Sequence, residues 1–225
     1  PRNKRIMGEA RKEYGIKKLV HLSSSEVYGT AVEVPIKENH RLQGQSPYSA
    51  TKIAADKLAE SFYLSFGLPV AIARPFNTFG PRQSARAIIP TIITQALSED
   101  KVIIGNDKPT RDLNYVSNTV DGLIQTASSE KSIGEVINFG SGTEISIRDL
   151  ADRIVSLLGK DIEIRQDKKR FRPDKSEVMR LVADNSKAKK LLGWKPKVSL
   201  EEGLTRTIKW VSGHLDLYKI GLYNK

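Results

Sequence analysis

The chain has 225 residues, of which 39% are hydrophobic and 28% charged, as expected for a soluble globular protein with one large domain or two small ones. It contains no cysteine, which excludes a disulfide framework and a thiolate metal site. No apolar run could span a bilayer and no signal-peptide pattern opens the chain, so we expect a cytoplasmic location and no membrane partner. The net charge of +11 indicates an anionic partner. Without a helix-turn-helix or zinc pattern, we expect phosphate on a small ligand and not nucleic acid.

Helical and strand-like segments alternate along the chain. The clearest is a helix over 47–66, where Ser46 can cap the N-terminus, Pro47 suits the first turn and Gly67 ends the helix. One apolar face of this helix comes from a four-residue repeat, namely Ala54, Leu58, Phe62 and Phe66. The other expected elements are helices over 6–14, 86–98, 117–127, 146–158, 185–192 and from Ser199 onward, and strands over 17–22, 68–73, 102–104, 114–116, 135–139 and 161–164. This alternation predicts an α/β fold with a parallel sheet.

The segment YSATK contains a pair of side chains suited to proton transfer. Tyr48 and Lys52 are four residues apart and therefore share a helix face. A lysine ammonium beside a phenol favours the phenolate, and a phenol that exchanges protons is what hydride transfer at an alcohol carbon requires. The alternative is a surface Tyr–Lys pair without a catalytic role. The position of the pair, just after a strand that ends on three serines, favours catalysis.

Four segments in this order, HLSSSEVYG, SPYSATK, ARPFNTFGPRQ and RDLNYV, together resemble the extended short-chain dehydrogenase/reductase family. FRPDKSEV and DNSKAKKLLGWKPKVSLEEGL resemble its C-terminal region, so the resemblance spans nearly the whole chain. It implies bound NAD, a nucleotide-diphosphate sugar as substrate, and a homodimer. It also implies a partial Rossmann-like parallel sheet with a smaller mixed substrate-binding region. Residues 1–80 would be the C-terminal half of the NAD-binding domain and 81–225 the substrate-binding region, with 112–140 returning to the sheet.

The resemblance also implies roles for catalytic and cofactor residues. Tyr48 would be the acid/base at the sugar C4 hydroxyl, and Lys52 would bind the nicotinamide ribose and tune Tyr48. Ser24 would hydrogen-bond the same C4 oxygen. Further cofactor contacts would come from Ser23, Pro75 and Phe76.

The implied substrate contacts lie in later segments. They are Asn77, Ile88, Pro90, Arg111, Asn138 and Arg172. Arg111 and Arg172 would bind the diphosphate, since a guanidinium fork matches phosphate oxygens. Three further arginines are either ligand contacts or residues of a solvated loop edge: Arg74, Arg82 and Arg86. No metal site is expected, because the three histidines lack metal-ligand spacing.

Glu26 distinguishes between the activities of the family. The resemblance implies that 4-epimerases need only reversible hydride transfer, whereas 4,6-dehydratases use a carboxylate here as the base that removes the C5 proton. Ser25 stands where dTDP-glucose dehydratases carry an aspartate as the acid for the leaving water, so the resemblance favours a UDP-N-acetylhexosamine-type substrate. UDP-glucuronate decarboxylases also carry this glutamate, so it does not by itself identify the reaction. A 4-epimerase and a non-catalytic sugar-nucleotide-binding relic stay alternatives.

The glycine-rich turn that grips the dinucleotide pyrophosphate does not occur in the sequence. We therefore expect the chain to be truncated and, as a 225-residue protein, to bind NAD weakly or not at all. Family members often dimerise through two helices per subunit. The helices over 47–66 and 6–14 would fill that role here.

Overall fold

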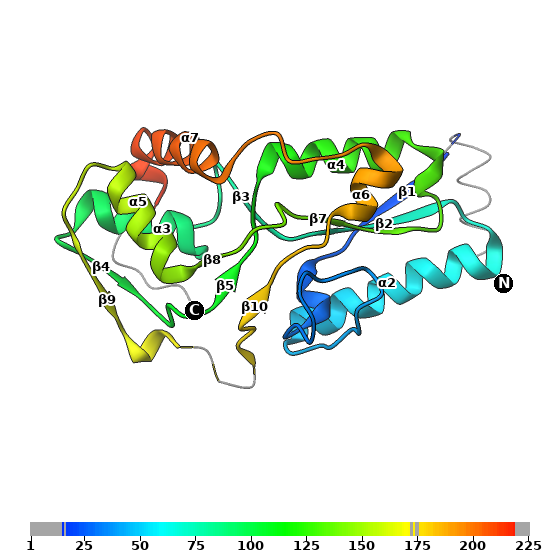
Figure 1. The fold of residues 1–225 in the computed structure, drawn as a ribbon, viewed down its shortest axis with the longest axis horizontal. Coiled ribbons are helices and arrows are strands. Elements are labelled where there is room, and N and C mark those ends of the chain that lie inside the picture. Colours follow the sequence, from blue (N-terminus) through cyan, green and yellow to red (C-terminus); the bar gives the residue numbers. More distant parts are fainter. Residues whose placement is uncertain (1–14, 16, 172, 174–175, 219–225) are drawn as a thin grey trace.

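The computed structural model describes residues 15, 17–171, 173 and 176–218, which form two halves side by side along the longest axis of the molecule (Figure 1). The helix expected over 6–14 lies outside the described residues. Within the described part of the chain, no helix has the length and apolar character needed to cross a membrane.

A three-stranded parallel sheet in the order β1-β2-β7 forms the centre of one half. Its strands are β1 (Leu19–Leu22), β2 (Val70–Pro75) and β7 (Val136–Phe139). The central strand β2 has the sequence VAIARP and is buried over its first five residues, as expected of a strand covered on both faces. All three carboxyl ends therefore meet at one edge, where parallel sheets place their ligands.

Helices cover both faces of this sheet. Helix α2 (Pro47–Phe66) lies on one face, and α4 (Val116–Ser128) and α6 (Ser186–Leu192) lie on the other (Figure 1). One apolar cluster joins the sheet to the second layer. It contains residues of β2, β7 and α6 and the tryptophan that follows α6: Ala73, Ile137, Phe139, Ala188 and Trp194. The Trp194 indole N–H donates to the Asn118 carbonyl oxygen at 3.0 Å, so its polar atom is also satisfied.

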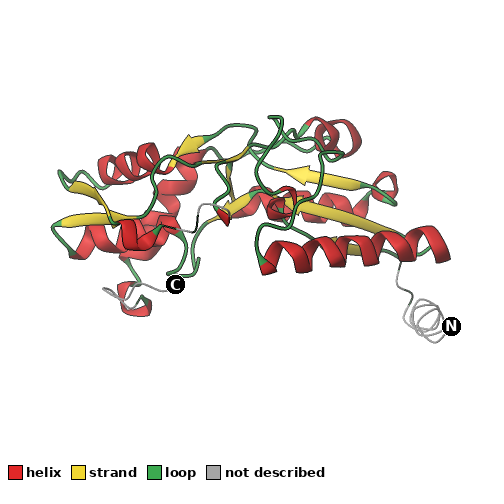
Figure 2. Cartoon of the chain, turned by 90° about the horizontal axis from the view of Figure 1, so that it is seen from below, coloured by secondary structure: helices red, strands yellow, loops and turns green. Residues whose placement is uncertain are grey.

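The second half packs three helices around the larger apolar core (Figure 2). These helices are α3 (Ile88–Ser98), α5 (Ile147–Leu157) and α7 (Leu200–Ser212). Strand β4 (Lys101–Ile104) pairs in parallel with β9 (Glu163–Gln166) at the edge. Serine caps begin α5 and α7 as predicted, because Ser146 Oγ accepts the Asp149 N–H and Ser199 Oγ accepts the Glu202 N–H.

Short strand pairs connect the two halves. They are β3 (Asn77–Phe79) with β6 (Leu113–Tyr115), and β5 (Thr110–Arg111) with β8 (Ile145–Ser146) and β10 (Arg180–Leu181). The remaining short helices are η1 (Ser25–Tyr28), η2 (Glu130–Ser132), η3 (Lys168–Arg170) and η5 (Leu215–Leu217).

The α/β fold with a parallel sheet is confirmed, and segment 112–140 returns to that sheet through β7. Residues 186–194 also pack against the sheet, so the segment 81–225 is not confined to the second half. The apolar repeat on α2 lies mostly on the solvent side, where Leu58 is 60% exposed and Phe66 47% exposed. The two buried residues of α2 are instead polar, namely Ser49 and Asp56.

Candidate active site

A tight turn follows β1 and carries the predicted serines and glutamate. Ser24 is the N-cap of η1, with extended backbone angles, and its Oγ accepts the Glu26 N–H at 3.2 Å. Gly29 ends the turn at a φ of 62°, and a Cβ there would lie 2.5 Å from Gln45 Oε1. The turn leaves Ser24 and Glu26 half-buried, whereas Ser23 and Ser25 are buried.

The Tyr48–Lys52 pair lies on the first turns of α2, beside the end of β1. Ser46 and Ser49 form a reciprocal cap that begins this helix, as Ser46 was predicted to do. Lys52 Nζ donates to the Leu22 carbonyl oxygen at 3.0 Å and lies 5.9 Å from the centroid of the Tyr48 ring. Lysine therefore holds the helix to the strand end, while the Tyr48 side chain is 53% exposed and open to a reactant.

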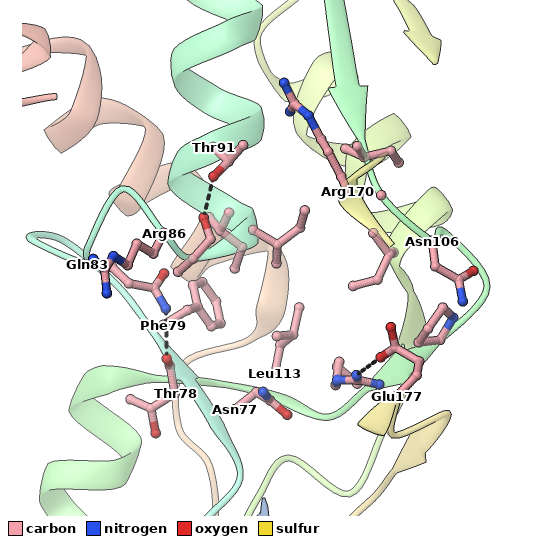
Figure 3. A pocket seen from close by; sticks show the side chains of 18 of the residues that line it. Asn77, Thr78, Phe79, Gln83, Arg86, Thr91, Asn106, Leu113, Arg170 and Glu177 are labelled. Atoms are coloured by element: carbon pink, nitrogen blue, oxygen red, sulfur yellow. Dashed lines mark hydrogen bonds and ion pairs between the residues drawn. The ribbon is translucent and has the colours of Figure 1, made fainter. Parts of the chain in front are cut away.

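A cavity of about 300 Å³ opens from this edge toward the second half (Figure 3). Glu26 lines it, together with Asn77 on β3 and Ile88 at the start of α3. Two side-chain oxygens at its wall, Asn77 Oδ1 and Gln83 Oε1, are buried and have no hydrogen-bond partner. Buried polar groups are normally paired, so these oxygens are acceptors that a water or a polar ligand in the cavity would satisfy.

Three arginines give the cavity a positive lining: Arg86, Arg111 and Arg170. Arg111 is nearly buried and lies 3.3 Å from Glu177 Oε1, to which one of its terminal nitrogens donates (Figure 3). Arg170 donates to the Ile103 carbonyl oxygen at 2.6 Å. Guanidinium groups in a partly enclosed cavity suit a phosphorylated ligand, as the net charge indicated.

The structure brings several of the predicted site residues to this edge and buries four others. Asn138 is fully buried, with its Oδ1 bonded to the Tyr28 hydroxyl and its Nδ2 to the Ile36 carbonyl. Phe76 packs in the core against Tyr28. Pro90 is buried in the first turn of α3 and lies outside the cavity wall. Ser25 is buried as well and does not line the cavity.

Other predicted residues have simpler outcomes. Pro75 is half-buried at the end of β2, next to Asn77. Arg172 lies outside the described residues. Among the residues described, no cluster of three or more histidine, aspartate or glutamate side chains could hold a metal ion, so none offers a metal centre.

The sequence reasoning missed a buried polar cluster behind the site. Arg74, expected at a ligand or at a solvated loop edge, lies inside β2 at 3% exposure. Its guanidinium contacts both Asp56 on α2 and the hydroxyl of Tyr28 on η1. The sequence did contain a signal for this cluster, namely an arginine within the apolar run VAIARP. A buried strand tolerates an arginine only when a hydrogen-bonding or charged partner pairs with the guanidinium.

Comparison with known proteins identifies similar sequences and structures. The family described as GDP-mannose 4,6 dehydratase matches residues 5–207. YtcB of Bacillus subtilis, an uncharacterized UDP-glucose epimerase, is 36% identical over 91% of this chain and 63% of its own length. The dTDP-glucose 4,6-dehydratase of Bacillus anthracis, in complex with NAD, is 30% identical with a TM-score of 0.82, over 96% of this chain and 68% of that one. UDP-glucuronic acid 4-epimerase of Bacillus cereus, in complex with UDP-glucuronic acid and NAD, is 30% identical with a TM-score of 0.83, over 96% of this chain and 66% of that one.

The chain thus spans less than two thirds of the length of the Bacillus subtilis relative. The matched proteins carry out both epimerase and dehydratase reactions at similar identity, so the comparisons support the shared chemistry of nucleotide sugars and not one reaction. Because the family match covers most of the chain, this protein belongs to the GDP-mannose 4,6-dehydratase family of nucleotide-sugar dehydratases and epimerases.

Proposed function

We propose that this chain carries the catalytic edge and the substrate cavity of a nucleotide-sugar 4,6-dehydratase. The observation that carries the proposal is the position of Glu26, which lines the arginine-rich cavity and follows Ser24 on the same turn. A general base must reach both the cavity and the reacting end of the sugar. Proton removal at C5 requires such a base, whereas a 4-epimerase needs only reversible hydride transfer.

The residues present fit the nicotinamide end of NAD. Ser23 Oγ is buried at the end of β1 without a partner, and the Tyr48 hydroxyl and Lys52 ammonium lie at the same strand end. These three groups would hold the nicotinamide ribose. When bound, NAD supplies a hydride acceptor that takes hydride from C4 and returns it to C6.

Tyr48 and Ser24 would handle the proton at the sugar C4 oxygen. The exposed Tyr48 phenol takes the C4 hydroxyl proton as the C4 carbonyl forms, and Ser24 Oγ donates a hydrogen bond to that oxygen. The ammonium of Lys52 stabilises the phenolate that does so. Leu22 fixes Lys52 through its carbonyl oxygen, so the ammonium stays beside the ring.

Glu26 would then perform the elimination. The C4 carbonyl acidifies the C5 proton, which passes to the Glu26 carboxylate as the bond from C6 to its hydroxyl breaks. The same proton leaves Glu26 on the departing hydroxyl as water, so the carboxylate is regenerated. As hydride returns to C6, C5 would take up a proton from solvent, and Tyr48 would release to solvent the proton that it took from the C4 hydroxyl, so the protons balance. Since Ser25 is buried, it has no role as a separate acid in this proposal.

The proposed substrate is a UDP-N-acetylhexosamine-type sugar, supported by the Ser-Ser-Glu pattern of residues 24–26. Arg111 would bind the diphosphate and Asn77 the sugar or diphosphate, since both line the cavity. A homodimer through α2 is part of the proposal. Its support is the exposure of three large apolar side chains on that helix: Leu58, Leu64 and Phe66.

A nucleotide-sugar 4-epimerase is the second candidate, favoured by the epimerases among the relatives. Incubation of the protein with NAD and UDP-N-acetylglucosamine, followed by mass spectrometry, separates the two reactions. A dehydratase forms a 4-keto-6-deoxy product with loss of one water, whereas an epimerase inverts C4 without a mass change. The Glu26→Gln variant should abolish water loss by a dehydratase, and water loss at the normal rate in that variant would refute the role of Glu26.

A further inference from the structure

The two elements that carry the proposed catalytic groups lie far apart in the sequence and are joined by one buried guanidinium. Ser24 and Glu26 belong to η1, whereas Tyr48 and Lys52 belong to α2. We infer that Arg74 is a positioning residue that sets the distance between these two elements, through Asp56 on α2 and Tyr28 on η1. This role rests on the proposed function, because it concerns the alignment of that reaction's groups.

On the helix side, Arg74 contacts Asp56 by two nitrogens. The Arg74 Nε donates to Asp56 Oδ2 at 3.0 Å, and a terminal nitrogen lies 2.9 Å from the same oxygen. The other carboxylate oxygen of Asp56 lies 3.0 Å from His21 Nε2 on β1. Asp56 is one turn beyond Lys52 and two turns beyond Tyr48, so it holds the helix face that carries both.

On the turn side, Arg74 donates to the Tyr28 hydroxyl at 3.0 Å, and its guanidinium carbon lies 5.0 Å from the centroid of the Tyr28 ring. Tyr28 in turn donates to Asn138 Oδ1 at 2.7 Å. Burial raises the pKa of the Tyr28 phenol above its ordinary value, although Arg74 opposes the shift, so the hydroxyl stays a neutral donor. Tyr28 is the last residue of η1, so this contact fixes the turn that carries Ser24 and Glu26.

The chemistry of this cluster suits the positioning of η1 and α2 better than it suits stabilisation of the fold. Apolar residues of similar volume often stabilise a core as well as a buried ion pair does, whereas a guanidinium fork holds two partners at defined distances and angles. A displacement of about 1 Å between reacting groups can lower a catalysed rate about a hundredfold. A buried arginine between η1 and α2 prevents such a displacement.

Amide hydrogen exchange of the purified chain tests this role without requiring turnover. Tyr28→Phe deletes only the hydroxyl, so η1 loses the hydrogen bonds to Arg74 and Asn138 while the buried ring stays beside the guanidinium. We expect exchange within residues 24–29 to accelerate about tenfold or more, the effect of losing a hydrogen bond to a charged partner. Exchange in α3 should stay unchanged.

Thr207→Val is the matched control, because Thr207 is another buried hydroxyl, bonded to the Gly203 carbonyl on the distant helix α7. It should leave η1 exchange unaltered. Unchanged exchange in η1 of Tyr28→Phe, or equal acceleration in η1 and α3, would overturn the inference.

Kinetics give the second readout. We expect Tyr28→Phe to lower kcat about tenfold or more while KM stays within about twofold, because the cavity that binds the nucleotide does not include Tyr28. Arg74→Lys keeps the charge but cannot bond both partners, so it should not rescue kcat. The exchange measurement needs neither NAD nor turnover, so it decides whether Arg74 holds the two elements together even where this chain, whose sequence contains no glycine-rich dinucleotide turn, turns over no nucleotide sugar.

Discussion

The ion pair between Arg111 and Glu177 predicts that a carboxylate in the cavity competes with the ligand. Both side chains are nearly buried, at 10% and 12% exposure, and they are 3.3 Å apart. If Arg111 binds a diphosphate, the phosphate oxygens must share or displace the Glu177 carboxylate. Glu177→Gln should therefore tighten the binding of UDP.

The magnitude follows from the contact that is replaced. A hydrogen bond that involves a charged group contributes about 1.5–3 kcal/mol. The glutamine amide can still accept from the charged guanidinium but lacks the charge of the carboxylate, so we place it at the lower end of this range, about 1 kcal/mol weaker than the ion pair as a competitor for Arg111. That difference corresponds to a dissociation constant for UDP about fivefold lower. Removal of the negative charge from the cavity wall acts in the same direction.

Isothermal titration calorimetry of the 225-residue protein with UDP measures this effect. Glu201→Gln is the control, since it also removes one negative charge but from an exposed pair with Arg153. It should leave the affinity for UDP unchanged. If Glu177→Gln binds UDP no more tightly than the wild type, Glu177 does not compete with the phosphate, and the assignment of Arg111 to the diphosphate loses its support.

Two further predictions concern stability. Burial raises the pKa of Glu38 above its ordinary value of 4.5, despite the Asn138 N–H that it accepts, so ionised Glu38 lowers the free energy of unfolding. Glu38→Gln should therefore have a larger free energy of unfolding than the wild type at neutral pH, and this difference should disappear as the pH falls toward 4.5. Urea unfolding at several pH values measures the difference. A difference that stays constant with pH would contradict the prediction. Gly134 has a φ of 79°, and a Cβ there would lie 2.5 Å from the Tyr63 ring. Gly134→Ala should therefore lower the melting temperature more than Gly159→Ala, which has a φ of 65° and open space, and equal losses would exclude crowding by Tyr63.

Local signals predicted the elements, but not which side chains each element buries. Ser46, Pro47 and Gly67 were sufficient to place α2, since capping and termination depend on neighbouring residues. The apolar repeat of α2 did not identify its buried side, because α2 contacts the sheet through Asp56, whose partner Arg74 is distant in sequence. A buried charge is recognised only together with the group that neutralises it, and a sequence does not state that pairing.

The resemblance located the candidate site along the chain with similar limits. It named Glu26, Asn77 and Arg111, which line one cavity. Glu26 and Asn77 follow β1 and β2, whose carboxyl ends meet, whereas Arg111 ends β5 of a separate sheet. The resemblance did not indicate that Asn138 and Phe76 are buried, since the direction of a side chain at a strand end depends on what packs beside it. In both cases the neighbour is Tyr28. Its hydroxyl donates to the Asn138 amide oxygen, and its ring packs against the Phe76 ring.

The geometry separates the proposed chemistry from recognition of the nucleotide. Tyr48 and Lys52 belong to the sheet half, whereas Arg86, Arg111 and Arg170 come from segments beyond β3. Among the proposed catalytic residues, Glu26 alone also lines the cavity. On the proposed roles, a change at this position would alter the reaction while the three arginines of the cavity stay in place. Such independence gives a physical reason why a dehydratase and an epimerase each resemble this chain at 30% identity.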